Sequence, residues 1–235
     1  MTALKIQERF VSLQGEGLLV GTPSSFVRVS GCNLRCTWCD SPATSWSPEG
    51  ARQTLDELVE FCAEGPRHVV LTGGEPMLLP GIADLARRLR ARGHHVTIET
   101  AGTVWLEDLE CDLMSISPKL AHSTPRDRAP SLADRHERLR WQPAVVQRLI
   151  DAFAWQLKPV LRTSSLDEDL AEFDRMLADL RLPSDAPART VLMPEGTDAG
   201  QLRESYARLV PVCLDRGYTL GQRLHIQLFG HTPGT

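Results

Sequence analysis

The chain has 235 residues, of which 42% are hydrophobic and 24% are charged, as in ordinary globular proteins. This length suits a single domain with a sizeable core, and the formal net charge of −4 offers no basic field that would attract nucleic acid. The opening MTALKIQERF contains no long apolar run, so we expect neither a signal peptide nor a membrane anchor, and a cytoplasmic location.

Short β-branched runs alternate with helical patterns along the chain. In chain order, we predict strands at residues 25–31, 68–76, 95–102, 113–119, 155–163, 189–195 and 223–230. The helices that we predict lie at residues 53–64, 82–93, 166–180 and 199–217. Thr54 and Glu57 have capping-box spacing at the start of the first helix, and Gly93 closes the second.

This alternation predicts an α/β fold with a parallel sheet covered by helices. About six strand–helix units in a chain of this length indicate an incomplete, partial TIM-type barrel, because a full eightfold barrel needs more residues. We expect one domain over residues 1–235. Residues 121–143 break the pattern with five arginines, two histidines and three prolines. They are predicted to form an irregular insertion, either a solvated surface segment or a lid over a site.

Polar residues and glycines follow four of the predicted strands at their ends. In parallel α/β sheets, the loops beyond the carboxyl ends of the strands build the site, so these segments are expected to converge. The residues in question are Cys32, Gly73, Gly74, Glu75, Thr100, Gly102, Ser117 and Lys119.

Three of the six cysteines, Cys32, Cys36 and Cys39, fall within the stretch GCNLRCTWCDS. Three thiolates on one loop can hold three corners of an iron–sulfur cube and leave the fourth iron open to a ligand. A zinc knuckle with a distant fourth ligand and a thioredoxin-like CTWC pair are the alternatives, and the spacing favours the open cluster. The other three cysteines, Cys62, Cys111 and Cys213, are interpreted as small buried hydrophobic residues.

The spacing C-x3-C-x2-C with Trp38 before the last cysteine, followed one strand later by GGEP, resembles the signature of radical S-adenosylmethionine (SAM) enzymes. Further motifs narrow the resemblance. LQGEG, CDS, ETAGT, ISPK and the closing RLHIQLFGHTPG are similar to the 7-carboxy-7-deazaguanine synthase family. The resemblance is dense over about the first 120 residues, returns at the C-terminus, and is thin over residues 121–143.

The resemblance implies conversion of 6-carboxy-5,6,7,8-tetrahydropterin to 7-carboxy-7-deazaguanine with loss of ammonia, on the route to queuosine or another deazapurine. It implies a 4Fe-4S cluster on Cys32, Cys36 and Cys39, together with SAM and Mg²⁺. An electron donor such as flavodoxin or ferredoxin and a homodimer are the implied protein partners. The residues implied to contact SAM are Trp38, Cys39, Asp40, Gly73, Gly74, Glu75, Gly102, Ser117 and Lys119.

The resemblance also implies a substrate site and a magnesium ligand. Ser41, where many members have Thr, would supply a hydroxyl to Mg²⁺; the alternative is a helix N-cap or a turn residue. Arg28 can pair with the substrate carboxylate, and it shares a strand face with Phe26 in the predicted alternation. The substrate contacts implied in all are the backbone of Leu13, Gln14 and Gly15, the side chains of Arg28 and Thr100, and the chain end at Thr235.

Two rival functions are considered. An activase that generates a glycyl radical on a partner protein shares the cysteine loop, but LQGEG and ETAGT argue against it. A zinc-binding interaction module would be colourless, whereas an iron–sulfur protein purified without oxygen is brown.

Overall fold

The computed structural model describes residues 2–235. Its strands are β1 (Ala3–Leu13), β2 (Pro23–Val29), β3 (Ala51–Thr54), β4 (His68–Gly73), β5 (His95–Thr100), β6 (Leu113–Ile116), β7 (Trp155–Leu157), β8 (Val160–Leu161), β9 (Val191–Pro194) and β10 (Thr219–Leu220). Its α-helices are α1 (Pro42–Ser45), α2 (Leu55–Ala63), α3 (Gly81–Ala91), α4 (Pro130–Leu139), α5 (Pro143–Ala152), α6 (Leu166–Ala178), α7 (Ala199–Arg216) and α8 (Leu224–Phe229).

Within residues 2–235, the main sheet has seven strands in the order β3-β1-β2-β4-β5-β6-β7. Strands β2, β4, β5, β6 and β7 pair in parallel, so their carboxyl ends share one edge. β1 is antiparallel to both of its neighbours. The parallel α/β architecture predicted from the sequence is therefore confirmed, whereas β1 and β3 were not predicted.

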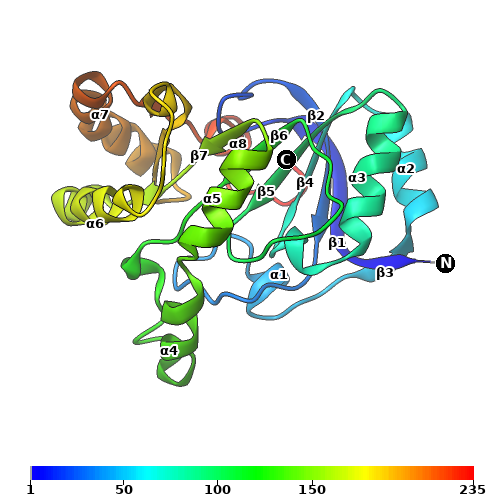
Figure 1. The fold of residues 1–235 in the computed structure, drawn as a ribbon, viewed down its shortest axis with the longest axis horizontal. Helices are drawn as coiled ribbons and strands as arrows, with labels where there is room; N and C mark the ends of the chain where they lie inside the picture. The colour runs from blue at the N-terminus through cyan, green and yellow to red at the C-terminus, as the bar shows by residue number, and fades with distance from the viewer. Residues whose placement is uncertain (1) are drawn as a thin grey trace.

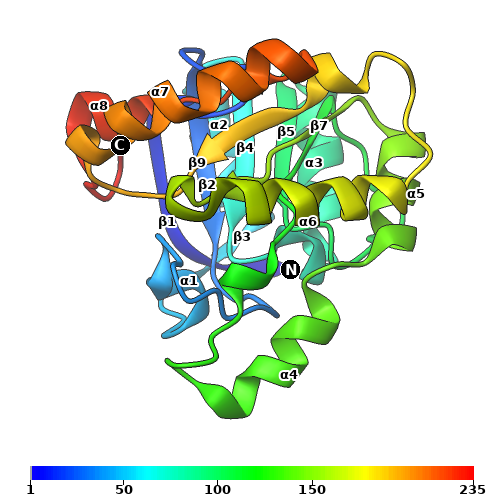
Figure 2. The same cartoon turned by 90° about the vertical axis from the view of Figure 1, so that its left-hand side faces the viewer.

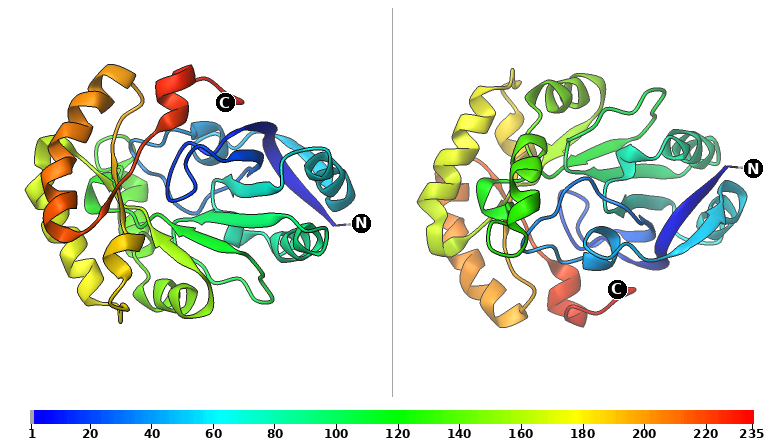
Figure 3. Two further views of the ribbon diagram at one scale, coloured as in Figure 1. Left: turned by 90° about the horizontal axis from the view of Figure 1, so that it is seen from above. Right: turned by 90° about the horizontal axis from the view of Figure 1, so that it is seen from below.

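A smaller parallel sheet of β10, β9 and β8 continues the curve of the main sheet, to which a single bridge between Leu157 and Thr190 connects it. The sheet does not close between β10 and β3, as a partial barrel requires. Helices α2 and α3 cover the outside of the sheet beside β1 to β4, while α6 and α7 cover its far end (Figures 1 and 2). Seen from above and below, the helices form an outer arc around the strands (Figure 3).

The core lies between this arc and the sheet, because alternate side chains of β2, β4 and β5 point outward to the helices. Val27 and Val29 are fully buried against α2 and α3, together with Val69 and Leu71. The capping box of α2 is present: Thr54 accepts from the Glu57 peptide N–H, and Glu57 accepts in return. Of the helices in residues 2–235, none combines the length and apolar character needed to cross a membrane.

The prediction of a strand over residues 223–230 is wrong, because these residues form helix α8. A strand would bury alternate residues, but burial here recurs after three residues: Arg223 is 4% exposed and Ile226 is 1% exposed. Leu228, which a strand would bury beside Ile226, is 53% exposed. The buried residues therefore follow the spacing of a helix, although the alternation in the sequence is typical of a strand.

The strand predicted over residues 155–163 is divided at Lys158 and Pro159. β7 pairs with β6 in the main sheet, whereas β8 pairs with β9 in the smaller one. Pro159 lacks a peptide N–H, and its carbonyl accepts from Met193 at 3.0 Å, so the chain changes sheets there.

The segment predicted to be irregular, residues 121–143, contains helices separated by irregular stretches. It begins with a 3-10 helix, Ala121–Ser123, and contains α4, which starts with Pro130 in the first turn, where a missing N–H costs no hydrogen bond. α4 extends away from the sheet at the lower edge of Figure 1. Ala133 and His136, three residues apart on α4, are buried.

Candidate active site

A cavity of about 470 Å³ opens where the carboxyl ends of the parallel strands meet the N-terminal loop, the cysteine loop and the C-terminal tail. The strand-end segments that the sequence predicted to converge therefore do so. Of the predicted site residues, those that line the cavity are Leu13, Gln14, Gly15, Arg28, Cys32, Cys36, Trp38, Cys39, Asp40, Ser41, Gly73, Gly74, Thr100, Ser117, Lys119 and Thr235.

The three thiols of the cysteine loop, residues 32–39, face this cavity from one side. Cys36 is 8% exposed, and Cys32 and Cys39 are half-buried. Burial raises the pKa of the Cys32 thiol to about 11 and that of Cys36 to about 12. Both are therefore protonated near neutral pH in the iron-free chain, and a bound cation would have to displace the protons.

Trp38 projects from the same loop and is enclosed by two other side chains. Its ring stacks on His122 with centroids 5.6 Å apart, and the Lys119 ammonium lies 5.4 Å from its centroid. The buried indole N–H has no hydrogen-bond partner in residues 2–235. Lys119 also donates to the Ser117 hydroxyl at 2.7 Å. Trp38, Ser117 and Lys119 thus line the cavity beside the cysteines, and the Trp38 indole N–H remains available as a hydrogen-bond donor.

Asp40, Ser41 and Arg28 form a second polar wall. Ser41 stands at the N-cap position of α1, but its side chain makes no capping bond. Its hydroxyl donates to Asp40 Oδ1 at 3.2 Å and lies 3.4 Å from Arg28 Nη1. Arg28 pairs with Glu8 at 2.7 Å and lies over the Phe10 ring, which stacks on Phe26 with centroids 4.7 Å apart.

The glycines of GGEP allow two backbone segments to approach closely. A Cβ on Gly73 would meet the carbonyl oxygen of Val29 at 2.2 Å, and one on Gly74 would meet that of Gly31 at 2.0 Å. These glycines therefore allow the loop after β4 to pack against the backbone that leads into the cysteine loop.

Glu75 and Gly102, both predicted to contact SAM, are not among the cavity-lining residues within 2–235. Glu75 is fully buried and accepts from the Thr100 hydroxyl at 2.7 Å and from the Ala101 N–H at 2.9 Å. It thus joins the loops after β4 and β5, and burial raises its pKa. Gly102 has a φ of +72°, and a Cβ there would meet Val146 at 2.8 Å in the core.

Several polar groups predicted to read the substrate already have partners. The Gln14 N–H donates to the Thr22 carbonyl at 2.7 Å, and the Gln14 carbonyl accepts from the Gly21 N–H at 2.8 Å, so the two ends of the loop between β1 and β2 are bonded to each other. The Thr100 hydroxyl donates to Glu75 and accepts from the Gly102 N–H at 3.0 Å. Both residues line the cavity, but these particular groups hold its wall together.

Sequence reasoning missed a buried charge network in the wall of the cavity. Lys158, 6% exposed in its side chain, pairs with Glu16 at 2.6 Å and with Glu99 at 3.3 Å. Burial acts against both charges, but the mutual attraction outweighs it, so the pKa of Glu16 is lowered and that of Lys158 is raised. Lys158 follows β7 at the same sheet edge as the predicted residues, so the rule that found them could have found it too.

The C-terminal segment contributes residues that the incorrect strand prediction concealed. Arg223, 4% exposed, pairs with Asp40 at 3.0 Å and lies 3.7 Å from Glu16. The pKa of Asp40 is lowered. Burial alone would raise it, but attraction to the Arg223 charge outweighs the effect of burial. His225 and His231 also line the cavity.

The residues fit the groups that the resemblance implies. Three thiols face one cavity that is large enough for more than a single ion. The unpaired Trp38 N–H, the Asp40 carboxylate and the Lys119 ammonium supply polar partners of both signs beside them. A soft thiolate set of this kind suits iron–sulfur chemistry.

Comparison with known proteins gives matches that extend over the whole chain. Residues 26–145 match the Radical SAM superfamily. The chain is 46% identical to the 7-carboxy-7-deazaguanine synthase of Rhodopirellula baltica, over 100% of this chain and 90% of that one. It is 42% identical to the enzyme of the same name from Halobacterium salinarum, over 99% and 93%. The crystal structure of QueE from Escherichia coli has the same fold, with a TM-score of 0.69, 24% identity and 95% coverage of both chains.

Proposed function

Because the chain belongs to the 7-carboxy-7-deazaguanine synthase family of the radical SAM superfamily, we propose that the cavity at the strand ends is the place where that reaction occurs. The chain is an enzyme that converts 6-carboxy-5,6,7,8-tetrahydropterin to 7-carboxy-7-deazaguanine with loss of ammonia, a step of queuosine biosynthesis. The observation that carries the proposed location is the meeting of three thiols, Arg28 and Lys158 on one cavity.

The cysteine side of the cavity is the proposed cofactor end. Cys32, Cys36 and Cys39 would hold the 4Fe-4S cluster, and when bound, cluster and SAM supply the radical that abstracts hydrogen. Trp38 and Lys119 would enclose SAM, and the chain's own task there is to orient it and keep water out. The remaining SAM contacts proposed are Asp40, Gly73, Gly74 and Ser117, with Glu75 and Gly102 acting through the loops that they brace.

The part of the cavity beside Arg28 is the proposed substrate end. The stacked rings of Phe10 and Phe26 offer a flat apolar wall suited to a planar heterocycle. Arg28 beside them would pair with the substrate carboxylate, since a guanidinium matches a carboxylate at two points. Leu13, Gln14, Gly15, Thr100 and Thr235 complete the proposed set of substrate neighbours.

Ser41 is the proposed magnesium ligand. Ser41 stands at the N-cap position of α1, but its hydroxyl makes no capping bond. The hydroxyl lies beside the Asp40 carboxylate instead. Hydroxyl, carboxylate and water oxygens are the ligands that Mg²⁺ prefers. This arrangement favours the magnesium interpretation over the N-cap alternative.

We also propose a cytoplasmic, single-domain enzyme that works as a homodimer and receives electrons from a flavodoxin or ferredoxin. Support for the dimer comes from exposed apolar side chains on the two last helices. Val210 and Leu214 are 40% and 81% exposed one turn apart on α7, and Leu228 and Phe229 are exposed on α8. Sedimentation of the purified protein tests this part.

The function is tested by an anaerobic assay with reductant, SAM and the carboxytetrahydropterin, with the product detected by mass. Cys36→Ala removes one thiol from the cluster, so it should abolish both product and SAM cleavage. Cys62→Ala is the matched control, because Cys62 lies on α2, is fully buried in the core and does not line the cavity. Near wild-type SAM cleavage by reconstituted Cys36→Ala would show that the cluster is assigned to the wrong residues.

A further inference from the structure

The segment after β6, residues 119–140, lies against the cysteine loop and satisfies its backbone. The Thr37 N–H donates to the Ser123 carbonyl at 2.8 Å, and the Arg35 N–H donates to His136 Nδ1 at 3.0 Å. These two peptide groups flank Cys36, the most buried of the three cluster cysteines. A buried N–H left without an acceptor is costly, so both contacts restrict the loop.

The hydrogen bonds of His136 define a single form of its imidazole. The ring is 2% exposed, and burial lowers its pKa to about 4, so it is neutral near pH 7. Nδ1 accepts from a peptide N–H, so the proton lies on Nε2, which donates to the Ser123 hydroxyl at 2.9 Å. That hydroxyl in turn donates to the Leu120 carbonyl at 2.7 Å. Both ring nitrogens are thus hydrogen-bonded, which fixes the orientation of the ring.

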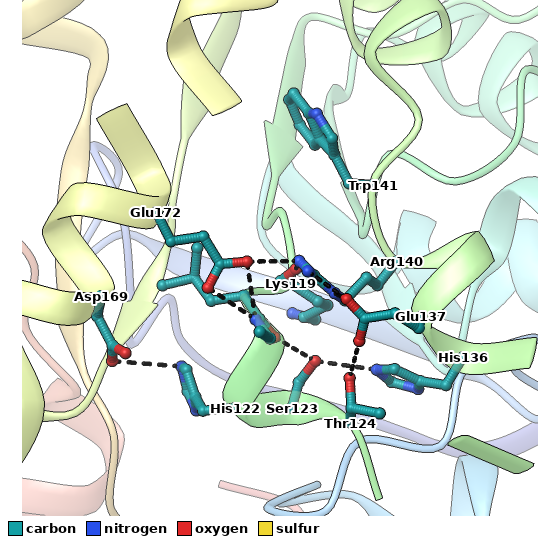
Figure 4. Close-up of polar contacts among 12 residues, drawn as sticks. Lys119, His122, Ser123, Thr124, His136, Glu137, Arg140, Trp141, Asp169 and Glu172 are labelled. Carbon is teal, nitrogen blue, oxygen red and sulfur yellow. Dashed lines mark hydrogen bonds and ion pairs between the residues drawn. The ribbon is translucent and has the colours of Figure 1, made fainter. Parts of the chain in front are cut away.

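α4 itself is anchored to the barrel wall, as Figure 4 shows. Arg140 lies between Glu137 of α4 and Glu172 of α6, with the second contact at 2.8 Å. Glu137 also accepts from the Thr124 hydroxyl at 2.6 Å. The Lys119 carbonyl accepts from Arg140 at 2.9 Å, so a residue proposed to contact SAM belongs to the same network.

A second contact reaches the outer side of the loop. Arg128 donates to the Thr37 carbonyl at 3.3 Å and lies 3.9 Å from the centroid of the Trp46 ring. Trp46 donates its indole N–H to the Cys36 carbonyl at 2.9 Å. The N–H groups of Arg35 and Thr37 and the carbonyls of Cys36 and Thr37 are therefore all bonded, three of them by residues far along the chain.

We propose that His136 is a positioning residue for the cysteine loop. Its Nδ1 atom fixes the peptide next to Cys36 so that the thiol faces the cavity before iron arrives. The role for iron in this inference rests on the proposed function, whereas the hold on the loop does not. Residues 121–143, where resemblance to the family is thin, thereby take part in the site as a clamp instead of a solvated insertion or a lid.

Two polar substitutions separate this role from general support of α4. His136→Asn retains an acceptor oxygen near the position of Nδ1, whereas His136→Gln moves its amide further out, toward Nε2 and Ser123. Two measurements are made: deuterium exchange of the peptide spanning residues 33–39 in the iron-free chain, and iron loss from the reconstituted holoenzyme to a chelator. Both should be about tenfold faster in His136→Gln than in His136→Asn, the change expected for one lost buried hydrogen bond.

Thr124→Val is the matched control, since it breaks the contact with Glu137 in the same network and leaves the Arg35 bond intact. It should exchange and lose iron within about twofold of the wild type, because the clamping bond of His136 remains. Equal rates in the Asn and Gln variants, or iron loss from Thr124→Val as fast as from His136→Gln, would overturn the positioning role. A wild type that takes up no cluster would instead refute the proposed function, and the exchange comparison would still decide the role of His136.

Discussion

Arg28 is already paired before any substrate arrives, so its use in binding requires an exchange of partners. Its guanidinium contacts Glu8 at 2.7 Å, and both side chains are 21% exposed. A substrate carboxylate would compete with Glu8 for the same group. The free energy gained on binding is the difference between the Arg28–substrate and Arg28–Glu8 ion pairs. Glu8 therefore helps to determine the affinity for substrate.

Arg28→Ala should weaken binding of the carboxypterin by roughly 30-fold or more, because removing one partner of a desolvated charge pair costs about 2–5 kcal/mol. The unpaired Glu8 adds repulsion. Arg28→Lys should recover only part, since Lys makes no two-point contact. Calorimetry under anaerobic conditions measures these affinities.

Glu8→Gln is the informative control for this prediction. It leaves Arg28 in place and removes its competitor, so substrate should bind as tightly as to the wild type or more tightly. Slow cleavage of SAM without substrate should persist in every variant, because the thiols lie on another loop. Unchanged pterin affinity in Arg28→Ala would remove Arg28 from the substrate site.

Ser41→Ala removes the only side-chain oxygen of that residue and should lower turnover and weaken its dependence on Mg²⁺. Iron content should stay the same, because Ser41 touches Asp40 and Arg28 and no cysteine. Turnover is measured across a series of Mg²⁺ concentrations, with iron determined in parallel. An unaltered Mg²⁺ response would exclude Ser41 as a magnesium ligand.

At the scale of elements, the sheet edge opposite the cavity is joined by a chain of side chains across three strands. The Ser24 hydroxyl donates to the Thr22 carbonyl, so His68 Nδ1, 2.7 Å from Ser24, must carry the proton. His68 Nε2 then accepts from the Thr97 hydroxyl at 2.8 Å. β2, β4 and β5 are thus joined by a neutral histidine.

This histidine predicts a dependence of stability on pH. Burial, aided by the nearby His95 and opposed by Glu99, lowers the pKa of His68 from 6.5 to about 4. Between these values the unfolded chain binds the proton and the folded chain does not, so stability is complete above pH 6.5 and falls as the pH drops toward 4. At about 1.4 kcal/mol per pKa unit, the loss is about 3 kcal/mol.

Urea unfolding of the iron-free chain at several pH values measures this effect. The free energy of unfolding should fall less steeply below pH 6.5 in His68→Asn than in the wild type. His136, whose pKa is also lowered to about 4, contributes equally to both proteins and cancels in the difference. Parallel curves for the two proteins would exclude His68 as a source of the dependence.

The elements predicted correctly are those in which the spacing of apolar residues along the sequence matches the side chains that the fold buries. The alternation in β2 placed Phe26 and Arg28 on the cavity face and Val27 and Val29 in the core, as the structure has them. Elements that depend on distant partners were missed: β1 needs β2 and β3 beside it, and α8 is oriented by Arg223 meeting Asp40 across 183 positions. Motifs predicted which residues approach the cavity but not the partners that occupy their polar groups.

At the scale of the whole molecule, Arg223 connects the C-terminal segment to the first third of the chain. Arg223→Leu removes the buried cation beside Asp40, leaves Glu16 paired with Lys158 alone, and should destabilise the protein by about 3–5 kcal/mol. Residues 222–235 should also become sensitive to protease. Unfolding and limited proteolysis report the two effects.

Arg216→Leu is the control, because it breaks the partly exposed pair with Asp174 at the end of α7. Exposed pairs contribute only about 0–1 kcal/mol, so that variant should remain near the wild type and its C-terminal segment should stay protected. Equal losses in the two variants would show that Arg223 does not hold the C-terminal segment in place.

The long reach of the contacts on the cysteine loop sets an order of events during biosynthesis. His136 follows Arg35 by 101 positions. His231, which bonds the Asp40 carbonyl, follows Asp40 by 191 positions. At about 5–20 residues per second, roughly 10–40 s separate the synthesis of Asp40 from that of His231. The thiols therefore emerge from the ribosome long before the residues that shape their loop. Iron delivered to a shorter nascent chain would meet an unformed site, so productive cluster insertion belongs after His231 has been synthesised.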